Sequence, residues 1–206
     1  ARRYPDKPCL IYYDSPLSYR DFHQQCERIA GYLQQVCGVR RGDRVLLYMQ
    51  NSPQWMLAYY GILRANAVVV PVNPMNRSEE LRHYVRDTGA TTGLLSQELY
   101  EQMAPLYGPQ AGLGLQHLVV AAYSDYLHQP TDLTLPAFVS EARQPLQGPG
   151  VTLWCDMLAS GLQPGPLETG PDDLCVMPYT SGTTGQPKGC MHTHRSTMST
   201  LVGGVH

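Results

Sequence analysis

Residues 179–194, YTSGTTGQPKGCMHTH, combine the side chains best suited to binding an anion. After Tyr179, the stretch to Gly189 holds four hydroxyl side chains, three glycines and one lysine, and no acidic residue. Glycine permits positive φ angles and close backbone approach, so such a loop can turn N–H groups and hydroxyls toward an anion. We therefore predict a phosphate-binding loop. A surface turn rich in Gly, Ser and Thr is the alternative that a shorter GTTG string would favour.

The lysine in this segment, Lys188, is one of only two in the chain, the other being Lys7. The protein otherwise uses arginine, so a compact ammonium at this position favours a specific contact with phosphate. The segment is not a nucleotide P-loop of the GxxxxGK[ST] type, because Pro187 and Gly189 stand where that motif needs Gly and Ser/Thr. Residues 189–193 are expected as a strand. The loop should therefore connect two strands, and the dipole of a helix should not be the main source of affinity.

His192 and His194 are two residues apart and would project from the same face of a strand. A metal-binding pair is conceivable, but we expect no third ligand from a nearby Cys, Asp or Glu. A histidine hydrogen-bonded within the structure is the alternative for either residue.

Helix-like and strand-like segments alternate over residues 1–121. Helices are expected at 18–36, 52–64 and 78–87, with a weaker one from Gln97, and Ser18, Ser52 and Ser78 stand at their starts. Strands are expected at 44–49, 67–72, 91–95 and 118–121. This alternation predicts an α/β fold of βαβ units with a mainly parallel sheet.

Three parts are expected along the chain. Residues 1–121 should form an N-terminal α/β subdomain. Residues 122–171 are punctuated by proline and glycine and should be an irregular connection with one short helix near 153–158. Residues 172–206 should contain the start of the phosphate-binding segment, in the order strand, loop, strand and helix.

Composition excludes several classes of protein. In 206 residues, 43% are hydrophobic and 16% are charged, so the chain should fold. A net charge of −2 without long basic runs argues against a nucleic-acid partner. The six cysteines are scattered without a CxxC pair, as in a reduced, cytoplasmic protein, and no apolar stretch approaches the roughly 18 residues of a membrane span.

The loop segment closely resembles the signature of the adenylate-forming (AMP-binding) superfamily, which includes acyl-CoA synthetases, adenylation domains of peptide synthetases and firefly-type luciferases. LSYRDF at 17–22, GDRV at 42–45 and GILRANAVVVPVNP at 61–74 extend the resemblance over essentially the whole chain. PKGCMHTHRST at 187–197 is most similar to bacterial fatty-acyl-CoA synthetases. The resemblance implies the N-terminal part of the large domain of such an enzyme.

The implied activity is that of an ATP-dependent acid:CoA ligase, with a fatty acid as the expected substrate and with ATP, Mg²⁺ and coenzyme A as reactants and cofactors. The ligase converts acid and ATP to an acyl-adenylate and pyrophosphate, and then forms acyl-CoA and AMP. Donors near the phosphates stabilise the charge that moves onto pyrophosphate. By resemblance, Lys188 would contact the leaving pyrophosphate, His194 would line the carboxylate pocket and Thr180 would lie near Mg²⁺. The residues that would wrap the β- and γ-phosphates are Thr180, Ser181, Gly182, Thr183, Thr184 and Gly185.

Later motifs of the family do not occur within these residues, so we expect the chain to be part of a longer protein. On its own it should be inactive and should self-associate through uncovered apolar surface. Two other readings stay open: a non-catalytic remnant that binds nucleotide phosphates, and an adenylation domain of a peptide synthetase or luciferase-like enzyme with a different acyl acceptor.

Overall fold

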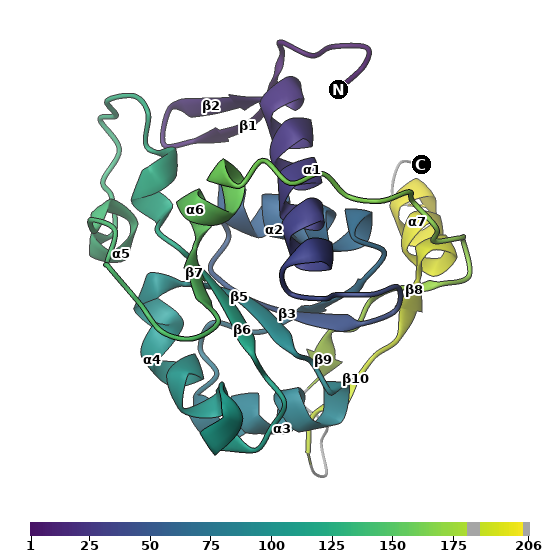
Figure 1. The fold of residues 1–206 in the computed structure, drawn as a ribbon. Helices are drawn as coiled ribbons and strands as arrows, with labels where there is room; N and C mark the ends of the chain where they lie inside the picture. The colour runs from purple at the N-terminus through teal and green to yellow at the C-terminus, as the bar shows by residue number, and fades with distance from the viewer. Residues whose placement is uncertain (181–185, 204–206) are drawn as a thin grey trace.

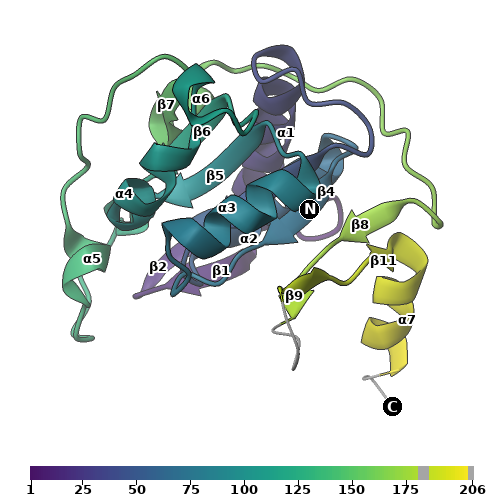
Figure 2. The same ribbon diagram turned by 90° about the horizontal axis from the view of Figure 1, so that it is seen from below.

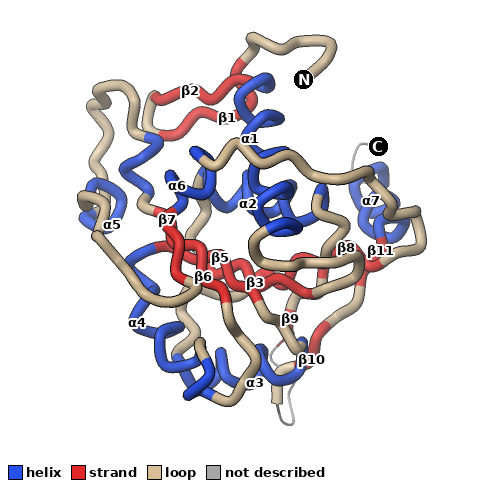
Figure 3. The backbone as a smooth tube through the Cα atoms, viewed as in Figure 1, coloured by secondary structure: helices blue, strands red, loops and turns tan. Residues whose placement is uncertain are grey.

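The computed structural model describes residues 1–180 and 186–203. Within these residues a seven-stranded sheet forms the centre of the molecule, with the strand order β11-β8-β4-β3-β5-β6-β7 (Figure 1). Helices cover both faces of this sheet (Figure 3). The predicted α/β fold with a mainly parallel sheet is confirmed, because only β11 pairs antiparallel to its neighbour, β8.

The strands of the sheet are short and agree closely with the apolar runs of the sequence. Those expected from the sequence are β3 (Arg44–Tyr48), β4 (Val68–Pro71), β5 (Thr92–Ser96) and β6 (His117–Ala121). Strands β8 (Leu174–Val176) and β11 (His192–Thr193) lie in residues 172–206, where strands are also expected, and β7 (Val151–Leu153) is the remaining strand of the sheet. A separate antiparallel hairpin, β1 (Pro8–Tyr12) and β2 (Ser15–Ser18), precedes the first helix.

Helix starts and ends follow local side-chain chemistry. Helix α1 (Tyr19–Gln35) begins after Ser18, whose Oγ accepts from the Asp21 N–H at 3.1 Å. Helix α2 (Pro53–Arg64) begins after Ser52 in the same way, with proline in its first turn. Helix α3 (Ser78–Thr88) ends at Gly89, which adopts a positive φ of 62°.

One expected helix cap is wrong. Ser78 does not cap α3, because its hydroxyl donates to the Gln102 carbonyl at 2.8 Å. The cap position is Arg77, whose N–H donates to the Glu80 carboxylate at 2.5 Å. The remaining helices are α4 (Tyr100–Met103), α5 (Ala137–Ser140), α6 (Trp154–Ala159) and α7 (His194–Gly203), and short 3₁₀ turns lie at Gln97–Leu99, Ala104–Leu106, Pro109–Ala111 and Tyr123–Tyr126.

Two hydrophobic cores lie on opposite faces of the sheet. Val45 and Leu47 of β3 pack with α1, α2 and α6, whereas Leu46 and Tyr48 pack with α3 and α4. This alternation is the two-residue period of a strand buried on both faces. At the α1–α2 contact, a Cβ on Gly61 would lie 2.5 Å from an Ile29 side-chain carbon, so the two helices meet at a position without room for a side chain.

Residues 122–171 contribute more to the sheet than their composition indicates. The predicted short helix is present as α6, whose Trp154 and Met157 are buried. Strand β7, which we did not predict, pairs parallel to β6 and extends the sheet. The division of the chain at residues 121 and 171 stays a prediction.

Strands β8 and β11 and helix α7 lie at the opposite end of the molecule from β7 (Figure 2). The segment with the anion-binding composition therefore lies at one end of the sheet. No helix in the described part of the chain has both the length and the apolar character needed to cross a bilayer.

Candidate functional site

The predicted phosphate loop connects two short strands, as expected. Strand β9 (Tyr179–Thr180) pairs antiparallel with β10 (Lys188–Gly189), with Thr180 opposite Lys188. Side chains directly opposite in an antiparallel pair leave the same face, about 5 Å apart at Cβ. Thr180 and Lys188 are both exposed, and their side chains therefore project from the same face of the β9–β10 pair, at the two ends of the loop. The other predicted loop residues, Ser181, Gly182, Thr183, Thr184 and Gly185, lie outside the described residues.

Helix α3 holds both ends of this loop (Figure 1). The Tyr179 hydroxyl donates to Asp87 Oδ2 at 2.5 Å, and its ring packs against that of Tyr84 with centroids 4.3 Å apart. At the other end, His83 Nε2 lies 2.8 Å from the Pro187 carbonyl oxygen. Burial, together with the bond to Asp87, raises the pKa of Tyr179, so its hydroxyl stays protonated as the donor.

Packing is tight around Gly189. A Cβ at this position would lie 3.0 Å and 3.1 Å from the Cγ and Sδ atoms of Met177, and 3.3 Å from Cζ of Tyr179. These separations are shorter than ordinary carbon contacts. The glycine therefore lets β10 lie close to the residues that fix β9.

His192 and His194 do not share a strand, so that expectation is wrong. Strand β11 ends at Thr193, whose Oγ1 accepts from the Ser196 N–H at 3.1 Å and caps α7. His192 is exposed, whereas His194 is the first residue of α7 and is partly buried. The described residues contain no group of three or more His, Cys, Asp or Glu side chains placed to hold a metal ion.

His194 lines an open hollow of about 1030 Å³ between α2, residues 167–171 and α7. Much of the lining is apolar and includes Leu63, Leu167 and Met198. The His194 Nε2 atom is buried and has no hydrogen-bond partner in the described part of the chain. Most buried polar atoms in native proteins are hydrogen-bonded, so an unsatisfied nitrogen beside a hollow is a candidate for a ligand contact.

Charged groups fix the backbone beside His194. The Gly170 N–H donates to Asp173 Oδ2 at 2.6 Å, and Arg41 forms an ion pair with the same carboxylate at 2.7 Å. The Gly170 N–H and the Arg41 guanidinium lower the pKa of Asp173. The Asp173 carbonyl accepts from the His194 N–H at 3.1 Å, which ties the start of α7 to this ionic contact.

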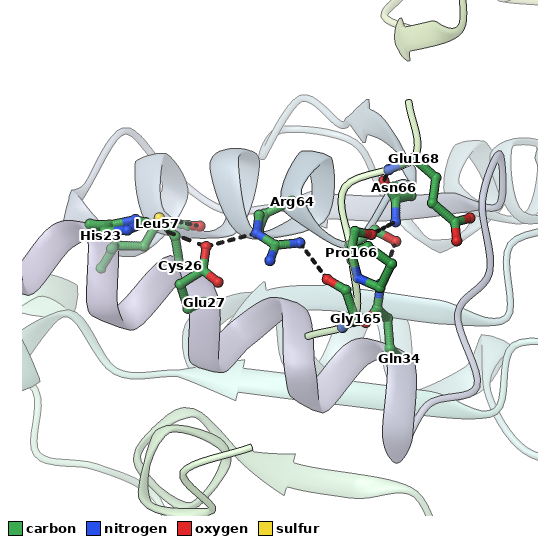
Figure 4. Close-up of polar contacts among 11 residues, drawn as sticks. His23, Cys26, Glu27, Gln34, Leu57, Arg64, Asn66, Gly165, Pro166 and Glu168 are labelled. Atoms are coloured by element: carbon green, nitrogen blue, oxygen red, sulfur yellow. Dashed lines mark hydrogen bonds and ion pairs between the residues drawn. The ribbon is translucent and has the colours of Figure 1, made fainter. Parts of the chain in front are cut away.

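The segment leading to the wall of the hollow is bound to α1 and α2 (Figure 4). Arg64 donates to Glu27 at 2.7 Å and to the Gly165 carbonyl at 3.0 Å. Asn66 Oδ1 accepts from the Glu168 N–H at 2.8 Å. Because Arg64 also lines the hollow, one side chain joins the helices to its wall.

Sequence reasoning missed the residues that position the loop, namely His83, Tyr84 and Asp87. Their spacing within a predicted helix puts His83 and Asp87 on one face. Nothing in that spacing indicates that this face meets a loop about a hundred residues later in the chain.

Comparison with known proteins gives consistent matches. The model of the family described as "AMP-binding enzyme" matches residues 1–205. A long-chain-fatty-acid–CoA ligase of Escherichia coli O157:H7 is 33% identical over 205 residues, which cover 97% of this chain and 36% of that protein. The chain thus spans about a third of the length of the curated relatives it matches.

Solved structures share the fold. The anthranilate CoA ligase AuaEII, in complex with anthranoyl-AMP, superposes with a TM-score of 0.73 at 25% identity, covering 94% of this chain and 33% of that one. A Mycobacterium tuberculosis fatty acyl CoA synthetase superposes with a TM-score of 0.70 at 22% identity, covering 98% of this chain and 35% of that one. At 22% identity, the similarity to the Mycobacterium tuberculosis protein shows a shared fold alone.

Proposed function

Because the chain belongs to the AMP-binding enzyme family, we propose that it is the N-terminal part of an ATP-dependent carboxylic acid:CoA ligase. A carboxylate oxygen attacks the α-phosphorus of ATP, and the bond to pyrophosphate breaks to leave an acyl-adenylate. The coenzyme A thiol then loses its proton, its sulfur attacks the acyl carbon, and AMP leaves. The product is a thioester.

The observation that carries this proposal is the register of β9 and β10. Pairing of Thr180 with Lys188 brings a hydroxyl and an ammonium to the two ends of one loop, on one face. In the proposed reaction Lys188 contacts the pyrophosphate as it leaves. Its charge then acts where negative charge increases in the transition state, which raises turnover more than it tightens ground-state binding.

Mg²⁺ fits this proposal as an ion held mainly by the substrate phosphates. It prefers oxygen ligands, and the exposed Thr180 hydroxyl is such a donor. Bound there, the ion would neutralise charge on the phosphates. The remaining hydroxyl and glycine residues of the loop, Ser181, Gly182, Thr183, Thr184 and Gly185, are proposed to surround the β- and γ-phosphates.

The acid is proposed to bind at the hollow beside His194. The buried Nε2 of His194, which has no hydrogen-bond partner among the described residues, can donate to a carboxylate, and the apolar lining favours an acyl chain. Long-chain-fatty-acid–CoA ligases are among the relatives, which supports a fatty acid as the substrate class. The shape of the hollow does not by itself select a chain length.

Residues 1–206 alone are proposed to be inactive, since the chain corresponds to about a third of its relatives. Exposed Met198 and Val202 of α7 support the further proposal that this piece self-associates when isolated.

The direct test uses the full-length protein with MgATP and carboxylic acids of graded chain length. Acid-dependent exchange between ATP and pyrophosphate is expected, together with acyl-CoA formation when coenzyme A is added. Exchange without thioester formation would favour another acyl acceptor, as in a peptide synthetase or luciferase-like enzyme. Nucleotide binding without exchange would favour a non-catalytic remnant.

A further inference from the structure

The His83 contact with the loop has a defined direction. A carbonyl oxygen only accepts hydrogen bonds, so His83 Nε2 must carry the proton and donate to Pro187 across 2.8 Å. The two residues are 104 positions apart in the chain. The bond is therefore a tertiary contact between α3 and the loop, beyond the reach of local helix or turn chemistry.

This hydrogen bond constrains the direction of the backbone at Lys188. Proline has a fixed φ and no N–H, so its carbonyl is its only group for hydrogen bonding. The peptide unit that joins the Pro187 carbonyl to the Lys188 nitrogen is planar. Holding the carbonyl oxygen therefore sets the direction in which the Lys188 backbone leaves Pro187.

The other end of the loop is held by the same helix. Asp87, one turn after His83, accepts from the Tyr179 hydroxyl at 2.5 Å. Helix α3 is itself fixed, because Leu81 and Val85 on its inner side are fully buried. One rigid element thus contacts the residue before Lys188 and the residue before Thr180.

From this geometry we propose that His83 is a positioning residue, which places Lys188 for its contact with the leaving pyrophosphate. The inference rests on the proposed function and adds a residue that acts through Lys188 without touching the substrate. Misplacement of a charged donor by about 1 Å can cost up to a hundredfold in rate. Loss of this one backbone anchor should therefore reduce turnover while leaving acid binding unchanged.

The test compares variants of the full-length protein in acid-dependent ATP–pyrophosphate exchange. His83→Leu removes the donor and keeps an apolar side chain, whereas His83→Gln keeps an N–H donor close to the position of Nε2. Arg86→Gln, an exposed change on the same helix, is the matched control. We expect His83→Leu to lower kcat about tenfold with the KM of the acid within twofold, and His83→Gln and Arg86→Gln to stay within twofold of wild type.

A second measurement separates this inference from the proposed function. Amide hydrogen exchange of peptides spanning residues 186–192 should be faster in His83→Leu than in wild type, and unchanged in Arg86→Gln. If wild type shows no acid-dependent exchange of pyrophosphate, the proposed function fails, and the amide exchange still reports whether His83 holds this strand.

Two results would overturn the inference: wild-type turnover in His83→Leu, or equal losses in His83→Gln and His83→Leu. Should His83→Leu not fold, Tyr179→Phe probes the other anchor of the same loop. Unchanged turnover in that variant would then count against positioning by α3.

Discussion

The Tyr179 hydroxyl donates to the Asp87 carboxylate, 92 residues earlier in the chain, at 2.5 Å. The bond joins β9, the strand before the loop, to α3, which packs on one face of the sheet. Asp87 is exposed, whereas Tyr179 is partly buried against Tyr84. Solvent around the Asp87 carboxylate therefore weakens this hydrogen bond.

Tyr179→Phe should remove the bond and keep the ring contact. We expect a loss of about 1 kcal/mol in the free energy of unfolding, the usual net value of one hydrogen bond. Turnover should fall several-fold, because β9 is less firmly held. Urea unfolding and pyrophosphate exchange test this, with Tyr19→Phe, at an exposed position at the start of α1, as the control. Equal stability and turnover in the two variants would contradict the role given to this bond.

Gly189→Ala should destabilise the hairpin by crowding. The new Cβ would press on Met177 and the Tyr179 ring, and overpacking typically costs about 1–3 kcal/mol. The flexible Met177 side chain is the nearest neighbour of the new Cβ. In a protein that already carries Met177→Ala, Gly189→Ala should therefore be less destabilising. A double-mutant cycle in urea measures this coupling. Independent, additive effects would show that Gly189 is not confined by Met177.

Glu98 should make stability depend on pH. Burial raises its pKa in the folded protein, above the value of about 4.3 in an unfolded chain. Between these two values the folded state binds more protons, so the free energy of unfolding falls as pH rises through this window. Glu98→Gln should remove that slope, while its amide oxygen can still accept from Ser96.

The measurement is the difference in unfolding free energy between Glu98→Gln and wild type at pH 4 and at pH 7. The variant should be relatively more stable at pH 7, and taking a difference cancels other titrating groups such as Asp173. Glu101→Gln, at an exposed helix position, is the control variant. A pH-independent difference for Glu98→Gln would rule out this contribution.

Local signals in the sequence predict most of the fold. Ser52 before Pro53 marks the start of α2, and Gly89 marks the end of α3, because caps depend on only a few neighbouring residues. Strand β7 is different, since its three residues follow a stretch rich in proline and glycine. Its stability comes from pairing with β6, a contact that no local pattern contains.

The site shows the same limit. Composition identifies the loop and Lys188, but the helix face that anchors it becomes visible only when α3 and the loop are brought together. The end of β11 did have a local signal, because Thr193 and Ser196 have the spacing of a helix cap. This spacing predicts that a helix begins at His194, so His194 and His192 belong to different elements.

Lys188→Ala in the full-length protein should affect turnover far more than folding. By analogy with the loss of one oxyanion-hole donor, removing this donor should cost on the order of 2.7–4 kcal/mol, or roughly a hundredfold to a thousandfold in rate. Lys188→Arg should rescue only in part, since a planar guanidinium does not replace a compact ammonium. The side chain is exposed, so the free energy of unfolding should change by less than about 0.5 kcal/mol. Wild-type exchange in the alanine variant would exclude Lys188 from phosphate handling.

His194→Phe should separate function from stability. The change replaces a buried nitrogen that lacks a partner in the described residues by carbon, which leaves stability unchanged or raises it. If Nε2 contacts the substrate carboxylate, the KM of the acid should rise about tenfold or more, with the KM of MgATP within twofold. His192→Phe, at an exposed position two residues earlier, is the matched control and should alter neither constant.

Measurements with acids of several chain lengths should show the same rise for each, because the contact is with the carboxylate and not with the acyl chain. An unchanged KM of the acid in His194→Phe would show that the hollow beside His194 does not bind the carboxylate.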